Sequence, residues 1–417
     1  MTSKTNKYLE IDRSEFLSIF EEISKIGWSE IYGMNRLALD ENDIKARHML
    51  IKRLKEINSL IRIDDAGNIM GVLEGDTKEI IATGSHLDAV PGGGRFDGTV
   101  GVVGALYALR YIVKNKIKTR HSIMAIDFTN EEGSRFQPSK MGSGLTTGVY
   151  DKEYIYSRKD AKGITFGEAL KLSGFMGDQN NRLMYSPIKS YVELHIEQGP
   201  ILEAEGYEIG IPHGIVGMVY LEVNFIGEQA HAGTTPIRYR SDALVPAGIL
   251  IKEIRDYIKS LDDSLRITVG KIDIWPNIHN VIPGIAKLII DIRSFYNKIL
   301  SDAIKYIIDI SNLIAKKEGN IEVEVKKLWE SPRVVFDKKL RDLIINTCQE
   351  LRLKCKEDIY SWAGHDAQNM SRITKTAMIF IPSHKGKSHT KEEYTSEKDL
   401  INGMKLLLNT MLVLDLS

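Results

Sequence analysis

The sequence has little of what marks a secreted or membrane-bound protein. It contains only two cysteines, Cys348 and Cys355, whose spacing fits neither a metal-binding motif nor a disulfide framework, so we expect two buried thiols in a reducing compartment. No apolar run reaches the roughly 18 residues that a membrane span needs. The N-terminal stretch MTSKTNKYLEIDRSEF lacks the apolar segment of a signal peptide. We therefore expect a cytoplasmic protein.

An excess of charge of one sign is also missing. Lys plus Arg and Asp plus Glu each number 56 in 417 residues, so the formal net charge is zero. This balance argues against nucleic acid or a membrane surface as a partner. Internal repeats and low-complexity tracts are absent as well. The length favours two or three domains, and a hydrophobic content of 43% is typical of globular proteins.

Two segments of the chain alternate between apolar runs and helical patterns. They extend from about residue 80 to 196 and from about 335 to the end, with runs such as EIIATGSH, SIMAIDFTNEE, SYVELHIEQG and TAMIFIPSHKGKSH. Apolar strands separated by helices predict an α/β sheet that is buried on both faces.

The pattern changes between about residues 214 and 327. Four alternating, strand-like runs and two amphipathic helices follow one another in the order β-α-β-β-α-β, which is that of a ferredoxin-like unit. We therefore predict a compact α+β unit, 214–328, inserted into an α/β domain that is formed by 1–213 and 329–417.

Possible metal ligands follow four of the predicted strands. Ligands bind beyond the carboxyl ends of strands in open α/β sheets. Each residue alone is a weak signal, because a single histidine after a strand is more often an ordinary hydrogen-bonded side chain. Gathered at one sheet edge, however, imidazoles and carboxylates favour a divalent cation between them. These residues are His86, Asp97, Glu131, Glu132, His195, Glu197, Gln198, His384 and His389, and a further stretch, AGHDAQ, contains His365 and Asp366.

The chemistry of this set predicts an open, catalytic metal site. Histidine mixed with Asp and Glu, without Cys, suits zinc, manganese, cobalt or nickel. The excess of ligands favours two ions that share a carboxylate. Asp88 lies two residues after His86, where it could orient the imidazole through the ring nitrogen that does not bind metal. The glycines of PGGG and Gly98 allow positive φ and a close approach of the backbone.

Seven motifs occur in order over more than 300 residues: GSHLDAVPGGGRFDG, NEEGSRF, ELHIEQGP, AHAGTTP, NVIPG with DIR, AGHDA and GKSHTKEEY. Through them the sequence resembles the amidase/hydantoinase/carbamoylase branch of metallopeptidase family 20, a superfamily of dinuclear-zinc aminoacylases and exopeptidases. The resemblance implies a zinc-exopeptidase-like catalytic domain and identifies the inserted unit as a lid or dimerisation domain. We expect a homodimer through that unit.

The resemblance also implies a role for individual residues. Two divalent ions, zinc before manganese, cobalt or nickel, would be bridged by Asp97. His86 and His195 would complete the ligands of one ion, and Glu132 and His389 those of the other. The general base would be Glu131, which removes a proton from water and delivers it to the leaving nitrogen.

Further residues are implied to contact the substrate. His231 on the lid would stabilise the oxyanion, from the same chain or across a dimer. Asn280 and Arg293 would hold the carboxylate of the substrate. Gln198 and Gly364 would line the pocket.

The substrate is implied to be a small ureido or amide compound with a carboxylate. Within the branch, GGRFDG and HAGTTPIRYRSDAL are most similar to N-carbamoyl-L-amino acid hydrolases. Allantoate amidohydrolase and β-ureidopropionase are alternatives, and an aminoacylase, an aminopeptidase or a non-catalytic binding protein are more remote ones. Trp362 and Lys387 depart from the usual residues of the branch, and the indole could narrow the range of substrates.

Overall fold

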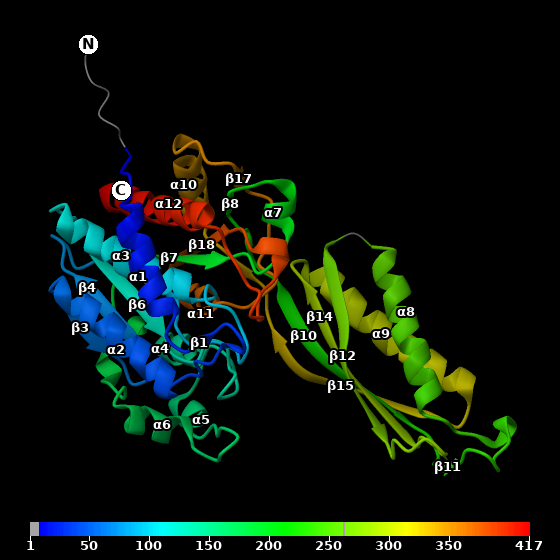
Figure 1. Ribbon diagram of the computed structural model, residues 1–417. Helices are drawn as coiled ribbons and strands as arrows, with labels where there is room; N and C mark the ends of the chain where they lie inside the picture. The colour runs from blue at the N-terminus through cyan, green and yellow to red at the C-terminus, as the bar shows by residue number, and fades with distance from the viewer. Residues whose placement is uncertain (1–7, 262) are drawn as a thin grey trace. The chain divides into compact units, whose positions relative to one another are not determined.

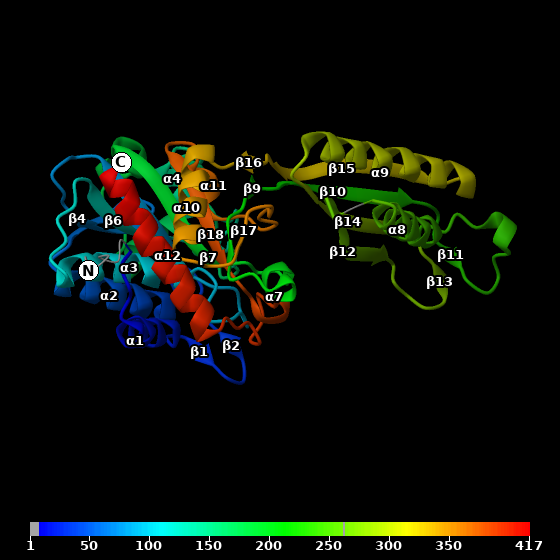
Figure 2. The same ribbon diagram turned by 90° about the horizontal axis from the view of Figure 1, so that it is seen from above.

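The chain divides into two units, Met1–His213 with Phe336–Ser417, and Gly214–Val335 (Figures 1 and 2). The computed structural model describes residues 8–261 and 263–417. The first seven residues, at the start of the stretch where we expect no signal peptide, lie outside this part. Among the described helices, none combines the length and the hydropathy that a membrane crossing requires.

The second boundary differs from the one expected at residue 328. Strand β15 (Glu322–Ser331) runs past that position. Beyond it, β16 (Val334–Val335) pairs with β9 (Gly214–Ile215), so the two segments that lead into and out of the inserted unit are joined by backbone hydrogen bonds. The unit therefore ends at Val335.

The larger unit is built on an eight-stranded sheet with the order β17-β8-β18-β7-β5-β6-β4-β3. Its four central strands run parallel to one another. Their residues are almost entirely buried, as expected for strands covered on both faces. The carboxyl ends of the four strands therefore meet at one edge of the sheet. The strands are β3 (Leu60–Ile63), β4 (Ile69–Leu73), β5 (Ile80–His86), β6 (Ser122–Phe128), β7 (Ile188–Ile196), β8 (Ile209–Gly210), β17 (Cys355–Lys356) and β18 (Lys375–Ile381).

Helices cover this sheet. The central helix α3 packs against β5, β6 and β7, and it also contacts α1, α2 and α12 (Figure 1). It is buried along most of its length, which explains why its sequence is apolar almost all round. Helices α4 and α11 contact each other, and α11 packs on β7 and β18. The helices are α1 (Arg13–Ser24), α2 (Glu41–Glu56), α3 (Thr99–Lys114), α4 (Met141–Thr146), α5 (Lys152–Tyr156), α6 (Phe166–Ser173), α7 (Ile201–Glu205), α10 (Lys338–Glu350), α11 (Asp366–Met370) and α12 (Glu397–Leu416).

The inserted unit has the predicted element order. Its antiparallel sheet has the strand order β12-β14-β10-β15. Alternate residues of β10 and β14 are buried in one core with the apolar faces of the two helices. The fold class predicted from the sequence, an α/β domain with an inserted α+β unit, is confirmed. The main elements are β10 (Gly217–Ile226), α8 (Leu244–Lys259), β12 (Leu265–Trp275), β14 (Ile285–Ser294), α9 (Asn297–Glu318) and β15, with a short pair, β11 (Ala230–His231) and β13 (Val281–Ile282), beyond the sheet.

The prediction of two free thiols is wrong. Cys348 on α10 and Cys355 on β17 form a disulfide, with their Cα atoms 6.6 Å apart. The chain turns back between helix and strand, which brings the two side chains together. Sequence spacing alone did not reveal this turn.

A buried arginine links α2 to the strand end that carries two of the predicted site residues. Arg47 donates hydrogen bonds to the Asp43 carboxylate, to the Gly67 carbonyl and to the Thr129 hydroxyl. Its Nη2 also lies 3.4 Å from the carboxylate of Asp127, in β6. All three charged side chains are fully buried, so the guanidinium compensates two carboxylates that have left water.

We predict that Arg47→Met lowers the free energy of unfolding by about 3–5 kcal/mol, because it leaves two buried carboxylates without a cation. Urea denaturation measures the change. Lys45→Met, which removes an exposed cation from the same helix, is the matched control and should change stability by less than about 0.5 kcal/mol. Equal effects of the two substitutions would contradict the prediction.

Candidate metal centre

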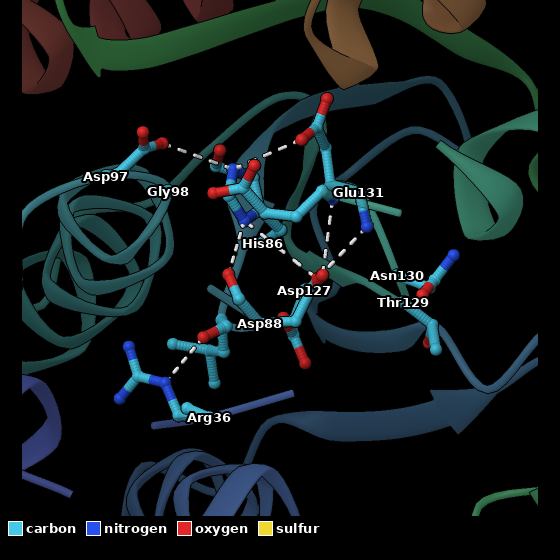
Figure 3. Close-up of polar contacts among 12 residues, drawn as sticks. Arg36, His86, Asp88, Asp97, Gly98, Asp127, Thr129, Asn130 and Glu131 are labelled. Atoms are coloured by element: carbon cyan, nitrogen blue, oxygen red, sulfur yellow. Dashed lines mark hydrogen bonds and ion pairs between the residues drawn. The ribbon is translucent and has the colours of Figure 1, made fainter. Parts of the chain in front are cut away.

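The edge where the parallel strands end carries most of the predicted site residues. His86 is the last residue of β5, and His195 is the last but one of β7. Glu131 and Glu132 follow β6, and His389 lies beyond β18. Figure 3 shows the carboxylates of Asp97 and Glu131 both directed at the ring of His86.

Asp97 stands at the centre of this cluster. Its Oδ1 lies 3.2 Å from Nε2 of His195 and 3.6 Å from Nε2 of His86. Its Oδ2 lies 3.3 Å from Nε2 of His389, which is itself 3.3 Å from Oε2 of Glu132. The two oxygens of one carboxylate therefore face two separate sets of ligands.

Hydrogen bonds fix the protonation of two of the imidazoles. Nδ1 of His86 lies 2.9 Å from the carbonyl oxygen of Asp88, and Nδ1 of His195 lies 2.9 Å from that of Ile196. A carbonyl oxygen only accepts, so each Nδ1 carries a proton. In a neutral ring Nε2 then presents a lone pair to Asp97. Lone pairs that face carboxylate oxygens at these distances require positive charge between them, from a proton on Nε2 or from a bound cation.

The loop that carries Asp97 is held by a residue that sequence reasoning missed. The Glu393 carboxylate accepts the backbone N–H groups of Phe96 and Asp97 at 2.9 and 3.1 Å. Gly98 has a φ of 62°, and a Cβ at this position would lie 2.4 Å from the His86 ring. Glycine is required here by both backbone conformation and space. Glu393 lies four residues after His389, in a motif where only His389 had been singled out as a ligand.

Asp88 supports the site in a different way from the one expected. Its backbone carbonyl, not its carboxylate, accepts the His86 hydrogen bond. The carboxylate instead accepts hydrogen bonds from the backbone N–H groups of Glu131 and Glu132, at 3.0 and 3.2 Å (Figure 3). Burial raises the pKa of Asp88 to about 6. Asp88 thus connects the end of β5 to the loop after β6.

The pKa directions describe a cluster that attracts positive charge. Burial alone would raise the pKa of Asp97, but hydrogen bonds from the three histidines hold it well below its ordinary value. Burial lowers the pKa of His86. The hydrogen bond that Asp97 accepts from the protonated ring, together with the charge of Glu131, outweighs burial and raises the pKa well above the usual range. For Glu132, burial and then the charge of Asp97 raise the pKa.

The donor set fits two divalent cations. One group of ligand atoms comes from His86, Asp97 and His195, and another from Asp97, Glu132 and His389, each within 4.8 Å of one another. Oε1 of Glu132 is buried and has no hydrogen-bond partner among the described residues. Neutral imidazoles and carboxylates are the ligands of catalytic zinc and related ions.

A third group, of Glu193, His195 and His365, does not require a metal ion. The Glu193 carboxylate accepts from the hydroxyls of Ser85 and Tyr191 and from the Ala367 N–H. His365 is paired with the Ser361 hydroxyl. Sequence reasoning missed Glu193, although a residue two positions before His195 shares its side of the strand.

Two more predicted residues of this unit have defined places. Nε2 of Gln198 donates to Oδ2 of Asp97 at 2.6 Å, so Gln198 contacts the centre directly. His384 does not: it is half exposed and forms an ion pair with Glu203. Gly364 precedes α11 and is partly exposed.

The predicted residues of the inserted unit lie at two ends of its sheet. His231 and Asn280 lie together beyond the end of β10, where the Ala232 N–H donates to the Asn280 carbonyl. Arg293 pairs with Met218 near the opposite end of β10. The length of β14 separates the two places, on the order of 25 Å. One carboxylate can therefore contact both Asn280 and Arg293 only if the two residues come from different chains.

Arg293 also has a partner within its own strand. Its Nη2 lies 2.7 Å from Oδ2 of Asp291, and both side chains are partly exposed. Arg293 thus forms an ion pair within its strand, in addition to any contact that it makes with a substrate.

Comparison with known proteins agrees with this geometry. Residues 82–413 match the model of Peptidase family M20/M25/M40. The chain is 35% identical to an N-carbamoyl-L-amino-acid amidohydrolase of Paenarthrobacter aurescens, over 92% of this chain and 93% of that protein. It is 33% identical to an allantoate amidohydrolase of Bacillus subtilis, over 96% of this chain and 97% of the relative. A solved amidase of the hydantoinase/carbamoylase family from Burkholderia multivorans matches with a TM-score of 0.89 and 34% identity, over 97% of this chain and 98% of that one.

We predict that metal content follows the two ligand groups. His86→Ala and His389→Ala should each lower the content of divalent metal from about two ions to about one per chain. Asp97→Ala should lower the content further, because Asp97 belongs to both groups of ligands. Elemental analysis after dialysis measures the content. His384→Ala, an exposed histidine five residues before His389, is the matched control and should keep full content. Full metal content in Asp97→Ala would refute the assignment.

Proposed function

Given that this chain belongs to peptidase family M20/M25/M40, we propose that it hydrolyses the ureido C–N bond of an N-carbamoyl-L-amino acid. The family predicted from the sequence motifs is confirmed. The chain is a metal-dependent amidohydrolase that acts on C–N bonds other than peptide bonds. The proposal concerns the substrate and the roles of individual residues.

One observation carries the proposal. The two oxygens of Asp97 face His86 and His195 on one side and His389 on the other. This is the arrangement that a bridging carboxylate of a dinuclear centre needs. Glu132 would complete the ligands on the His389 side. Zinc is our first choice of metal, with manganese, cobalt or nickel as alternatives.

We propose Glu131 as the general base. Its Oε2 lies 3.8 Å from Nε2 of His86, and it is buried beside the ligands without belonging to either group. Divalent ions at this site would supply Lewis acidity and lower the pKa of water. Glu131 would accept a proton from the attacking water and deliver it to the nitrogen of the leaving amino acid.

The overall reaction consumes one water. The C–N bond between the carbamoyl carbon and the amino-acid nitrogen breaks, and the carbamate that is released decomposes to carbon dioxide and ammonia. The relative from Paenarthrobacter aurescens carries the name of this activity, which supports an N-carbamoyl-L-amino acid as the substrate. Allantoate is the second candidate, because it too combines a ureido group with a carboxylate and the Bacillus subtilis relative is named for it.

We also propose that two chains share the binding of one substrate. His231 and Asn280 lie at the opposite end of the inserted sheet from Arg293, so a substrate that is bound by both groups needs a second copy of the chain. His231 would then stabilise the oxyanion and Arg293 would hold the carboxylate. The edge strand β12, with exposed Ile272 and Trp275, offers a surface through which two copies could pair.

We predict that the wild-type enzyme releases ammonia from N-carbamoyl-L-methionine faster than from allantoate or N-carbamoyl-β-alanine. Glu131→Gln should lower kcat by about 10²–10⁴-fold, because it removes the proton acceptor. It should retain the metal ions, because Glu131 is in neither ligand group. Ammonia release and elemental analysis measure the two effects.

A dipeptide and N-acetyl-L-methionine serve as control substrates. Cleavage of the dipeptide alone would reject ureido hydrolysis. Loss of metal from Glu131→Gln would instead show that Glu131 is a metal ligand and that its role as general base had been assigned wrongly.

Shared binding makes a prediction for mixed dimers. We expect His231→Ala and Glu131→Gln each to be nearly inactive alone. When the two are co-expressed in equal amounts, half of the dimers are mixed, and each mixed dimer has one intact site of its two. The mixture should therefore show about one quarter of wild-type activity. Co-expression of Glu131→Gln with Asp97→Ala, both in the larger unit, is the matched control and should restore nothing. Absence of recovery with His231→Ala would show that each chain acts alone.

A further inference from the structure

A buried lysine beside the candidate metal centre has no carboxylate partner. Lys140 is 8% exposed. Its ammonium has three donors, and among the described residues only one of them is used, in a hydrogen bond of 3.1 Å to the Ser139 hydroxyl. No Asp or Glu of the described chain lies within ion-pair distance. Lysine is almost never buried in this way without a partner.

The position of Lys140 is fixed by the loop that carries the proposed general base. Its backbone N–H donates to the Glu131 carbonyl at 2.8 Å, and its own carbonyl accepts from the Asn369 side chain and from the Gly144 N–H. Its φ is 57°, in the left-handed region that non-glycine residues rarely adopt. A strained conformation held by several contacts often serves a binding or catalytic role.

The ammonium lies against a partly exposed part of the site. A Cβ at Gly364 would come within 2.6 Å of Nζ of Lys140, so the ammonium occupies the space that any larger residue at Gly364 would fill. Gly364 and its neighbours Trp362 and Ala363 are partly exposed. A substrate group that lies over Gly364 can therefore reach Nζ. Burial is the main cause that lowers the pKa of His365, next in the chain, and the charge of Lys140 adds to it.

We propose that Lys140 binds a second carboxylate of the substrate, so that the enzyme prefers N-carbamoyl-L-amino acids with an acidic side chain. The inference rests on the proposed function, which supplies the first carboxylate and the ureido group. An ammonium is not a metal ligand, and Lys140 is not paired with Glu131, so neither metal binding nor activation of the base accounts for it. A carboxylate from the substrate supplies the missing counter-charge and accepts hydrogen bonds from the two remaining N–H groups of the Lys140 ammonium.

The test compares isosteric substrates that differ in charge. We expect wild-type kcat/KM for N-carbamoyl-L-aspartate to exceed that for N-carbamoyl-L-asparagine. Lys140→Met should lower this ratio roughly 10–100-fold, the value of one hydrogen-bonded charge pair, and Lys140→Arg should retain most of it. The same ratio for N-carbamoyl-L-glutamate and N-carbamoyl-L-glutamine allows for a longer side chain. Lys162→Met, which removes an exposed lysine of the same unit, should leave both ratios unchanged.

Binding separates this inference from the proposed function. Calorimetric titration of the Glu131→Gln enzyme with the same four compounds, with and without Lys140→Met, gives the affinity ratios without turnover. Equal ratios in both backgrounds would overturn the role of Lys140, as would an equal fall for the acidic and the neutral compounds. Wild-type enzyme that releases ammonia from no ureido acid would overturn the proposed function, whatever the affinity ratios are.

Discussion

The larger unit is organised around one electrostatic constraint, the placement of acceptor nitrogens against the carboxylate of Asp97. Backbone carbonyls accept hydrogen bonds from the Nδ1–H groups of His86 and His195, so the Nε2 atoms of the two neutral rings face carboxylate oxygens that also carry lone pairs. The arrangement is favourable only with positive charge in between. The parallel strands, Gly98 and the Glu393 carboxylate keep these groups close, although a neutral imidazole nitrogen and a carboxylate repel each other. Divalent cations turn that repulsion into cohesion.

Beneath the ligands lies a second set of buried charges, which determines how the loops are placed. Asp88 connects β5 to the loop of Glu131 and Glu132 through backbone N–H groups. Asp127, one residue before the end of β6, faces Arg47. Burial raises the pKa of Asp127 to about 7, although the positive charge of Arg47 acts to lower it. The proposed general base, Glu131, is thus positioned by groups beneath the candidate ligands. Precise placement of a catalytic carboxylate depends on such supporting contacts.

Sequence reasoning predicted the parts of this site that strand ends determine. His86, Glu132 and His195 follow or end parallel strands, and parallel strands have only one carboxyl edge. It did not predict that the Asp88 carbonyl rather than its carboxylate would meet His86, because a spacing of two residues allows both. The separation of Asn280 from Arg293 follows from antiparallel register, which no single motif contains. The disulfide depended on a turn between helix and strand. Lys140 lies outside all the motifs, and Glu193 begins the motif ELHIEQGP but is not a histidine and was not singled out.

The division between chemistry and specificity follows from where these residues lie. Among the candidate metal ligands, His86 and His195 lie in central strands, where hydrogen bonds to neighbouring strands limit movement. Lys140 and Gly364 lie on the connections before α4 and α11, which contact each other on the same side of the centre. A substitution there can change the charge offered to a substrate without moving an imidazole or Asp97. Relatives that act on different ureido acids can therefore share one centre, and the choice among such substrates should be sought in these connections.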